Sequence, residues 1–566
     1  MHRKTYSEYS VNHRRRSTNE LAWQFLARGT DVPAYGVPGG EEIPMEIGDV
    51  GETSVDRRHL ERCEESELPY VLFNQDSSYH SSNSLEDTED QVFDGVREWA
   101  SVGVTHTKVS ELLKILRKHR CFEEWPADAC TLLSTPRETE VKNIGGGCYS
   151  HCGLKRKILQ HLEEFRVLRS SETLNLQCNV DGLSLAKSSN SQLWPILVAF
   201  GDFLEIEPFT MGIFHGYSKP TSVGEYLNDL KEELLQVLED GIQFGGKMYR
   251  VAMTAFIVDS PAYSYLTDTV SHTGYYSCRK CVTREEYEDT NVAFNDFDAA
   301  MRTDEGFRRQ DQEEHHRGHS PLEDLHGIDM VKNFPYDYMH LACLGAMRKL
   351  LLLLMTGPLL VRLQTLLVSM LCERLEYIRD FLPSEFQRKS RSVREVKRWK
   401  ATELRQVMLY TRPYVFKDIV SDDVYVHFLS FHYAMRCYVG VRYGHRRRAA
   451  QKLMHYFASN FKNLYGRRSV SHNVHALIHV HDDAAHYGCL ERVSCFKFEN
   501  KLQRLKKLVR KRPLQQIVRR EAEMRLSVSS QVANHVKVLR DVEYLQLGLQ
   551  APFYSSILVK NFKVTH

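Results

Sequence analysis

The sequence lacks an excess of charge of either sign. Its 566 residues include 75 Lys and Arg against 73 Asp and Glu, which leaves a formal net charge of +2 at pH 7. This balance excludes a protein that binds nucleic acid through its overall charge, so any nucleic-acid surface must be a local cluster of cations. With 42% hydrophobic residues, the chain is long enough for about two to four packed units.

The sequence also lacks the segments that mark export or a membrane span. Residues 1–20 are basic and polar, without the apolar core of a secretory signal. The richest apolar stretch, 350–371, is interrupted by Gly357, Pro358 and Arg362. Its continuous apolar part is far shorter than the roughly 20 residues that a bilayer requires. We interpret this stretch as buried helices and expect no membrane partner.

A disulfide framework is absent as well. The thirteen cysteines are scattered along the chain and odd in number. This usage indicates reduced thiols, with room for one metal site, in an intracellular setting.

Composition and periodicity divide the chain into units. Residues 1–91 are polar and have little apolar periodicity, which is typical of a disordered region. Apolar residues at helical spacing then predict a helical unit that continues into a glycine-rich connection, 92–170, with Thr105 or Thr107 as an N-cap. The apolar residues that indicate this unit are Val92, Val96, Trp99, Leu112, Leu113, Ile115 and Leu116.

Apolar β-type runs alternate with a helical pattern farther along the chain. The β-type runs occupy 173–186, 193–201 and 247–263, and each has a glycine or an acid near its end. A strongly amphipathic helix is predicted for 223–242. This alternation predicts an α/β fold.

Two of these β-type runs end in an aspartate. Asp181 follows the first run in the motif NVDG, and Asp259 follows the third in IVDSPAY. If the two strands are neighbours, both carboxylates lie at one edge of a sheet, where they can hold Mg²⁺ and support two-metal phosphoryl transfer. An aspartate at a strand end is also a common turn former, so the residues alone leave both interpretations open.

Further motifs follow in a distinctive order. They are Cys278-Arg-Lys-Cys281, Asp337-Tyr-Met-His340, and FKFENKLQRLKKLVRKRP from Phe496. Together with the two aspartate motifs, they resemble the transposase core of CACTA (En/Spm-type) DNA transposons, in a form often met in animal genomes. The resemblance runs from about Val92 almost to the C-terminus.

The resemblance implies an RNase H-like fold, in which a mixed sheet flanked by helices is interrupted by a large all-helical insertion. The first part of the core is expected at 171–345, with a CxxC insert at about 272–330. The helical insertion is expected at 346–468, the last part of the core at 469–530 and a tail at 531–566.

The resemblance also implies an activity. Asp181, Asp259 and Glu499 are expected to hold two Mg²⁺ or Mn²⁺ ions and to catalyse cleavage and strand transfer of double-stranded DNA in the nucleus, in a homo-oligomer. Glu499 has a simpler interpretation as a surface helix carboxylate. For the whole chain, the alternatives are a domesticated, inactive nuclear factor that binds DNA or protein, and a metal-dependent nuclease unrelated to transposition.

The CxxC pair is a candidate Zn²⁺ site. Cys278 and Cys281 supply two thiolates, but a structural zinc site requires four ligands. The resemblance supports zinc, whereas the residues alone are equally consistent with plain buried cysteines. The further donors considered are His272, His315, His316, His319, His326, His340 and Cys343.

Two other polar groups have alternative interpretations. Asp337 and His340 are three residues apart, and His340 either contacts DNA or the zinc unit, or forms with Asp337 a polar brace between the insertion and the core. The histidine-rich segment 472–483 includes His475, His479 and His481, and we expect a hydrogen-bonded cluster or a phosphate-contacting surface there in preference to a metal site.

A basic helix follows Glu499 directly. Its cations can neutralise DNA phosphates without reading sequence, although a solvated face or a nuclear localisation signal has the same composition. The residues expected to bind DNA are Lys501, Arg504, Lys506, Lys507, Arg510, Lys511 and Arg512.

Overall fold

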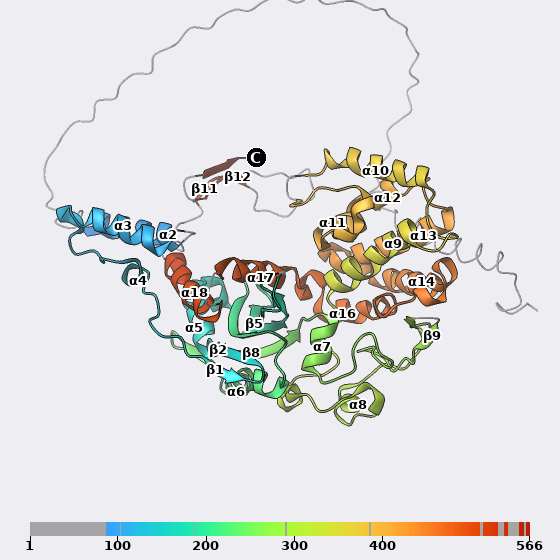
Figure 1. Ribbon diagram of the computed structural model, residues 1–566, viewed down its shortest axis with the longest axis horizontal. Coiled ribbons are helices and arrows are strands. Elements are labelled where there is room, and N and C mark those ends of the chain that lie inside the picture. The colour runs from blue at the N-terminus through green and yellow to red at the C-terminus, as the bar shows by residue number, and fades with distance from the viewer. Residues whose placement is uncertain are drawn as a thin grey trace, which may run out of the picture.

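The protein is described from a computed structural model (Figure 1). The structure describes residues 86–101, 104–186, 188–288, 291–383, 386–509 and 513–529, with short strands at 537–541, 554–559 and 562–565. Disorder was predicted for residues 1–91, but 86–91 are the start of the helix α2 (Glu86–Ser101), and residues 1–85 lie outside the described residues. The predicted DNA contacts at Arg510, Lys511 and Arg512 also lie outside them.

A mixed sheet forms the centre of the first half of the chain. Its strand order is β1-β2-β6-β5-β3-β8-β7, with the short β4 beside β5. Strand β3 pairs antiparallel with β5 and parallel with β8, and β5 pairs antiparallel with β6. The predicted α/β class is therefore confirmed. The strands are β1 (Lys142–Ile144), β2 (Gly147–His151), β3 (Thr173–Val180), β4 (Leu183–Ser184), β5 (Gln192–Phe200), β6 (Phe209–Gly216), β7 (Ile242–Phe244) and β8 (Lys247–Phe256).

Both faces of this sheet are buried, as the side chains of β5 show. Alternate residues point to opposite faces of a strand. Leu193, Leu197 and Ala199 belong to the core shared with the helical insertion, whereas Ile196 and Val198 belong to the core on the other face. Helices α5 (Leu154–Glu164) and α6 (Val223–Asp240) cover that second face. The strand is therefore a near-continuous apolar run.

The chain between the sheet and the insertion has little regular structure. After α7 (Ser260–Leu266) it forms the hairpin β9 (Glu286–Glu288) and β10 (Asn291–Ala293), the short helix α8 (Asp304–Arg308) and brief 3-10 turns. This is the segment that contains Cys278 and Cys281. Its termini meet the sheet at β8, where Phe256 N–H donates to the carbonyl of Asn333 (2.7 Å).

The insertion consists of helices joined by loops in its described residues. It begins with a π-helix, η6 (Met339–Met347), which continues directly into α9. The following helices are α9 (Arg348–Thr356), α10 (Thr365–Arg379), η7 (Val393–Arg398), α11 (Ala401–Gln406), η8 (Val407–Thr411), α12 (Arg412–Val415), α13 (Asp422–Val439) and α14 (Arg447–Tyr465). Between 346 and 468 the described residues form no strand, so this part of the chain is all-helical, as predicted.

The apolar stretch 350–371 forms parts of two helices, because α9 ends at Thr356 and α10 begins at Thr365. Within the described residues one helical span, Met339–Thr356, has the length and hydropathy of a membrane-crossing segment. Half of that span is buried inside the protein. A core helix passes the same test, so the span is weak evidence for a membrane.

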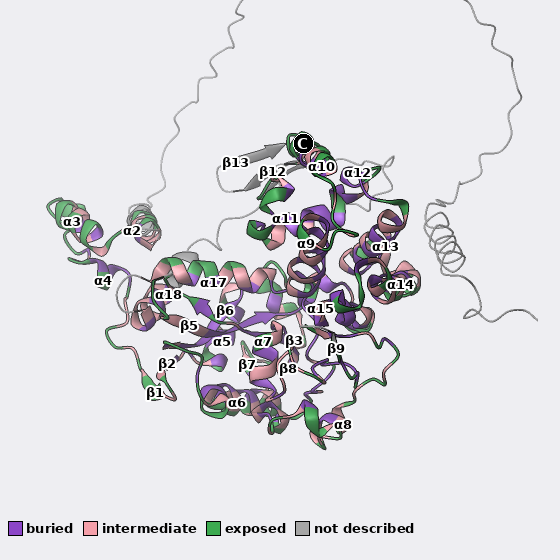
Figure 2. Ribbon diagram, turned by 45° about the vertical axis from the view of Figure 1, so that its right-hand side comes forward, coloured by how far each residue is buried: buried purple, intermediate pink, exposed green. Residues whose placement is uncertain are grey.

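The chain then returns to the sheet. Helices α15 (His472–Ala476), η11 (Leu477–His479) and α16 (Val480–Tyr487) close the insertion, and α17 (Phe496–Leu508) and α18 (Pro513–Ser529) lie along the sheet unit (Figure 1). The outward face of α17 is exposed (Figure 2).

The N-terminal helical unit contains α2 (Glu86–Ser101), α3 (His106–Leu116) and α4 (Ala129–Leu132). Thr105 caps α3, as one of the two predicted positions. The expected apolar face is partly wrong, since Val92, Trp99 and Ile115 are exposed. The predicted Leu113 is buried, and Val96 and Leu116 pack against the same core. The other buried residues are Ala100, Val109, Trp125, Ala129, Leu132 and Leu133, because α3 packs against the later helix α4.

Candidate functional site

Asp181 and Asp259 follow neighbouring parallel strands. The last paired residues of β3 and β8 are Cys178 and Phe256. Asp181 comes three residues after Cys178, and Asp259 comes three residues after Phe256. The two aspartates therefore leave the sheet at the same edge, which is the arrangement expected from the sequence.

Gly182 follows Asp181 because an aromatic ring lies against it. A Cβ atom at this position would lie 2.8 Å from Cζ2 of Trp194 on β5, so a larger side chain would displace the ring. The N–H of Gly182 also donates to Asp181 Oδ1 (2.6 Å). Close packing, and not only a turn, thus requires glycine here.

Asp259 caps a helix in addition to ending a strand. Its Oδ1 accepts a hydrogen bond from the backbone N–H of Ala262 (2.8 Å) at the start of α7. Such an N-cap typically contributes about 1 kcal/mol. Among the described residues no hydrogen bond reaches the other oxygen, Oδ2, which remains available for a ligand.

A row of polar side chains on β3 faces the start of α17. Lys497 Nζ donates to Gln177 Oε1 (2.7 Å), and Asn179 Nδ2 lies 3.8 Å from Cys495 Sγ. Asp181 is the next residue in this alternating row. The polar face of β3 therefore leads from Gln177 directly to the candidate acid.

Glu499 comes to the same place from the first turn of α17. Its carboxyl group lies within hydrogen-bonding reach of Asp181. Burial, followed by the negative charges of Asp259 and Glu499, raises the pKa of Asp181 well above its usual value. The three acids expected from the sequence thus converge, and their mutual repulsion is what a bound cation would relieve.

Asp337 is a buried carboxylate that joins two segments. Its Oδ1 accepts from the backbone N–H groups of Met339 (3.2 Å) and Cys495 (2.8 Å). Its Oδ2 accepts from the backbone N–H (3.0 Å) and ring Nδ1 (2.7 Å) of His340. Burial opposes ionisation, but these bonds and the charge of His340 lower the pKa of Asp337. Asp337 therefore braces the insertion against the segment that leads to Glu499.

His340 carries a positive charge beside the acids. Burial opposes this charge, but the hydrogen bond and charge of Asp337, with the charges of Asp259 and Asp181, raise the pKa of His340 to about 9. Because Nδ1 is bonded to Asp337, Nε2 is the nitrogen left for another partner. A hollow of about 180 Å³ opens here, and its polar lining includes Asp259, His272, Arg279, His340 and Asn473.

The contribution of His340 to stability should depend on pH. Its pKa rises from 6.5 to about 9 on folding, so the protonated ring stabilises the fold fully below pH 6.5, and this contribution is lost as the pH rises through 9. The shift corresponds to at most about 3 kcal/mol. Melting curves of the wild type and of His340→Gln should therefore converge between about pH 6 and pH 10. A difference in melting temperature that stays constant over this range would contradict the assignment.

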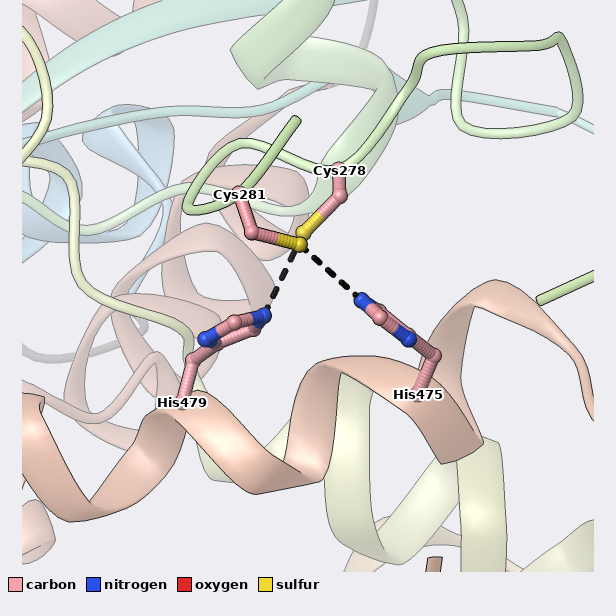
Figure 3. Close-up of side chains that lie close together, drawn as sticks. All are labelled: Cys278, Cys281, His475 and His479. Carbon is pink, nitrogen blue, oxygen red and sulfur yellow. Dashed lines mark hydrogen bonds between the residues drawn. The ribbon is translucent and has the colours of Figure 1, made fainter. Parts of the chain in front are cut away.

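A second cluster joins the CxxC segment to the helices that close the insertion. The ligand atoms of Cys278, Cys281, His475 and His479 all lie within 4.8 Å of one another, and all four residues are buried (Figure 3). Cys278 Sγ lies 3.5 Å from His479 Nε2, and Cys281 Sγ lies 3.3 Å from His475 Nε2. Sulfur and nitrogen ligands of a tetrahedral zinc ion are about 3.5 Å apart. The cluster can therefore hold a metal ion.

The two thiols of this cluster titrate as a pair. Burial opposes ionisation of Cys278, but hydrogen bonds with Cys281 and the histidines lower the pKa of Cys278 well below its usual value. The hydrogen bond with Cys278, together with burial, raises the pKa of Cys281. One thiolate is thus favoured already, and the thiolate is the form that binds metal.

A buried ion pair holds the CxxC loop against α16. Lys280 Nζ lies 2.8 Å from Asp483 Oδ1, and both side chains are almost fully buried. Asp483 Oδ2 accepts from the backbone N–H of Tyr336 (2.7 Å), and Lys280 also donates to the carbonyl of Val331 (2.9 Å). The loop is therefore fixed to its partner helix next to the cysteines.

The donors expected to complete the CxxC site do not do so. His315 Nδ1 donates to the carbonyl of Tyr276 (2.6 Å), and His340 pairs with Asp337. The cluster within 4.8 Å likewise does not include His272, His316, His319, His326 or Cys343. Each of these donors belongs to another environment.

The histidines of the cluster come from segment 472–483, for which the sequence favoured a site without metal. His475 and His479 point at the two cysteines (Figure 3), so the four residues form a hydrogen-bonded cluster that could also hold a metal ion, and His481 is not part of it. The signal was their spacing, since residues four apart lie on one face of a helix.

The basic helix α17 is only partly free to bind a ligand. Lys501 is largely buried in an ion pair with Glu521 (2.5 Å), so its expected role in DNA contact is not supported. Arg504 pairs with Glu207 on the surface, and Lys506 donates to the carbonyl of Ser184. Lys507 is exposed. The described cations of α17 thus serve largely to fix the helix to the sheet unit.

A scan against protein-family models found no match to this chain, and neither did a search of curated proteins.

Proposed function

We propose that this protein is a DDE-type DNA transposase, or a relative derived from one, which cleaves and joins double-stranded DNA with divalent metal ions. The observation that supports this most directly is the convergence of Asp181, Asp259 and Glu499 at one edge of the sheet, with the raised pKa of Asp181 as its consequence. Hard oxygen ligands of this kind suit Mg²⁺ or Mn²⁺.

The strand order supports an RNase H-like core. Three consecutive antiparallel strands, β3, β5 and β6, are followed by α6 and then by β8, which pairs parallel with β3. The first two acids end the two parallel strands of this motif. The third lies on a helix that reaches the sheet only after the all-helical insertion.

The chain's own residues have separable roles in the proposed reaction. Asp181, Asp259 and Glu499 would hold two metal ions, and such ions would supply activation of a hydroxyl nucleophile and charge stabilisation in phosphoryl transfer. Asp337 fixes the ring of His340 through Nδ1, so Nε2 can donate to a phosphate oxygen near the acids. His340 is thereby a proposed DNA contact, not a zinc ligand.

We further propose that the buried cluster of Cys278, Cys281, His475 and His479 holds Zn²⁺. Two thiolates and two imidazoles in tetrahedral spacing form a closed structural site. The ion would fix the helices before α17 against the chain that follows α7. It would act in structure and not in the reaction.

Strand transfer in vitro tests the proposed activity. The full chain is incubated with a linear duplex that carries the inverted terminal repeats flanking its coding region, a target plasmid, and Mg²⁺ or Mn²⁺. Joined products that require the divalent ion would support the proposal. DNA binding without any cleavage or joining would instead support the domesticated alternative, and cleavage without preference for the repeats would support an unrelated nuclease.

A further inference from the structure

Residues 388–400 form a strongly cationic segment that the acid site does not use. The segment contains seven Lys and Arg residues and a single Glu, a net charge of +6, whereas the whole chain carries +2. The rest of the chain is therefore net negative. Together with residues 501–512, this segment is one of the dense clusters of cations in the chain, and it belongs to the helical insertion.

Buried and basic side chains each recur every three residues along this segment. Ser390, Val393, Val396 and Trp399 are buried, and the 3-10 helix η7 (Val393–Arg398) runs through the segment. A 3-10 helix has three residues per turn, so every third side chain lies on one face. A second row has the same spacing of three residues but is shifted by one position toward the C-terminus, and all its members are basic: Arg388, Arg391, Arg394, Lys397 and Lys400.

Four members of this basic row are exposed, and these four define the cationic ridge: Arg388, Arg394, Lys397 and Lys400. Among the described residues none of the four forms an ion pair with an acidic side chain. Arg391 differs, because its guanidinium lies 2.6 Å from Glu403 Oε1. Within the part of the chain that the structure describes, the ridge is therefore not paired with carboxylates.

The ridge is held rigidly on the insertion. Trp399 Nε1 donates to the carbonyl of Ser392 (3.2 Å), and Ser390 Oγ donates to Gln406 Oε1 (2.9 Å). The pair of Arg391 and Glu403 fixes the same segment to α11. A preorganised row of cations loses little conformational entropy when it meets a ligand.

The ridge is also connected to the acid site. It leads directly into α11, where Arg405 Nε donates to the hydroxyl of Tyr338 (2.9 Å), the residue before the π-helix of His340. Arg405 also pairs with Glu491 (3.1 Å), which precedes α17. In both views α11 stands beyond α17 on the same side of the sheet unit (Figures 1 and 2).

We propose that the cationic ridge binds the phosphate backbone of double-helical DNA, an inference that rests on the proposed function and assigns its substrate a second contact surface. Arg394 and Lys397 lie three residues apart within η7, which spaces them by about 6 Å along its axis, and Arg388 and Lys400 flank this helix. The segment's one aromatic residue, Trp399, is buried, so the ridge offers no surface on which unpaired bases could stack. These features favour duplex DNA over single-stranded nucleic acid.

The salt dependence of binding tests this inference. The variant Arg394→Ala/Lys397→Ala/Lys400→Ala is compared with the wild type by fluorescence anisotropy on a random-sequence duplex of about 30 base pairs. Each lost phosphate contact reduces the slope of log affinity against log salt by about 0.9, so the slope should fall by about 2 to 3. We expect at least about tenfold weaker binding near 100 mM salt.

A charge-matched variant separates the ridge from general charge loss. Lys155, Arg250 and Arg284 are exposed cations of the sheet unit and its CxxC segment, and their triple alanine variant should retain the wild-type slope. The inference would be overturned if the ridge variant had the same salt slope as the wild type, or if both triple variants lost the same amount of duplex affinity. It would also be overturned if the ridge variant lost binding to single-stranded RNA but kept its binding to the duplex. Asp181→Asn keeps the ridge, so it should lose joining but bind DNA normally. Failure of joining alone therefore counts against the proposed function and not against the ridge.

Discussion

Asp181→Asn should reduce metal-dependent DNA cleavage and joining by about 10³-fold or more, equivalent to about 4 kcal/mol of transition-state stabilisation. The substitution keeps the size of the side chain but removes a charged metal ligand. Asp259→Asn and Glu499→Gln should have losses of the same order. Initial rates of product formation at saturating Mg²⁺ measure the effect.

The fold should survive this substitution. The pKa of Asp181 is raised by burial and by Asp259 and Glu499, so its ionised form destabilises the folded state as the pH rises above 3.8. Without divalent ions at pH 7, Asp181→Asn should therefore melt at the same temperature as the wild type or higher. Added Mg²⁺ should raise the melting temperature of the wild type only.

Asp202→Asn is a matched control for the acid site. Asp202 follows β5, which runs antiparallel to β3, so it lies at the opposite edge of the sheet, where its carboxylate accepts from Asn175 Nδ2 (2.6 Å). Activity should be unchanged in this variant. A wild-type rate in Asp181→Asn, or an equal loss in Asp202→Asn, would show that the three acids do not form a catalytic site.

Loss of the second metal site should have the largest effect on stability. The purified wild type should contain about one Zn²⁺ per chain, and Cys278→Ser or His479→Gln should abolish this content. Because a structural zinc ion supplies folding free energy directly, each variant should lower the free energy of unfolding by about 4 kcal/mol or more. Elemental analysis and thermal unfolding, with and without a chelator, measure the two effects.

Cys343→Ala is the control for the zinc site. Cys343 is a fully buried thiol in the π-helix, outside the Cys and His cluster. Its variant should keep the zinc content of the wild type and lose only the packing of one sulfur atom. Full zinc occupancy in Cys278→Ser would refute the assignment of the four ligands.

The positions of the first two acids could be predicted from the sequence because they depend on local patterns. A β-type run that ends in an acid places that acid at a sheet edge, and Asp181 and Asp259 lie as expected. The polar alternation of Gln177, Asn179 and Asp181 was a further signal, since it marks the face of β3 that meets the start of α17.

The four residues of the Cys and His cluster were harder to predict because their association depends on long-range packing. Cys278 and His479 are separated by 201 residues, and no local pattern relates them. Neighbouring histidines such as His315 seemed closer donors, but burial and the carbonyl of Tyr276 hold that ring elsewhere. The role of Lys501 was missed for a related reason, because its partner Glu521 lies on the following helix.

The long separation between the paired Cys and His residues also determines when the site can assemble during translation. The sheet and two acids leave the ribosome first, whereas His475, His479 and Glu499 follow only after the whole insertion. Closing a loop of 194 residues between Cys281 and His475 costs about 5 kcal/mol of chain entropy, which metal binding can offset. A nascent chain therefore cannot assemble the three acids until Glu499 has been made.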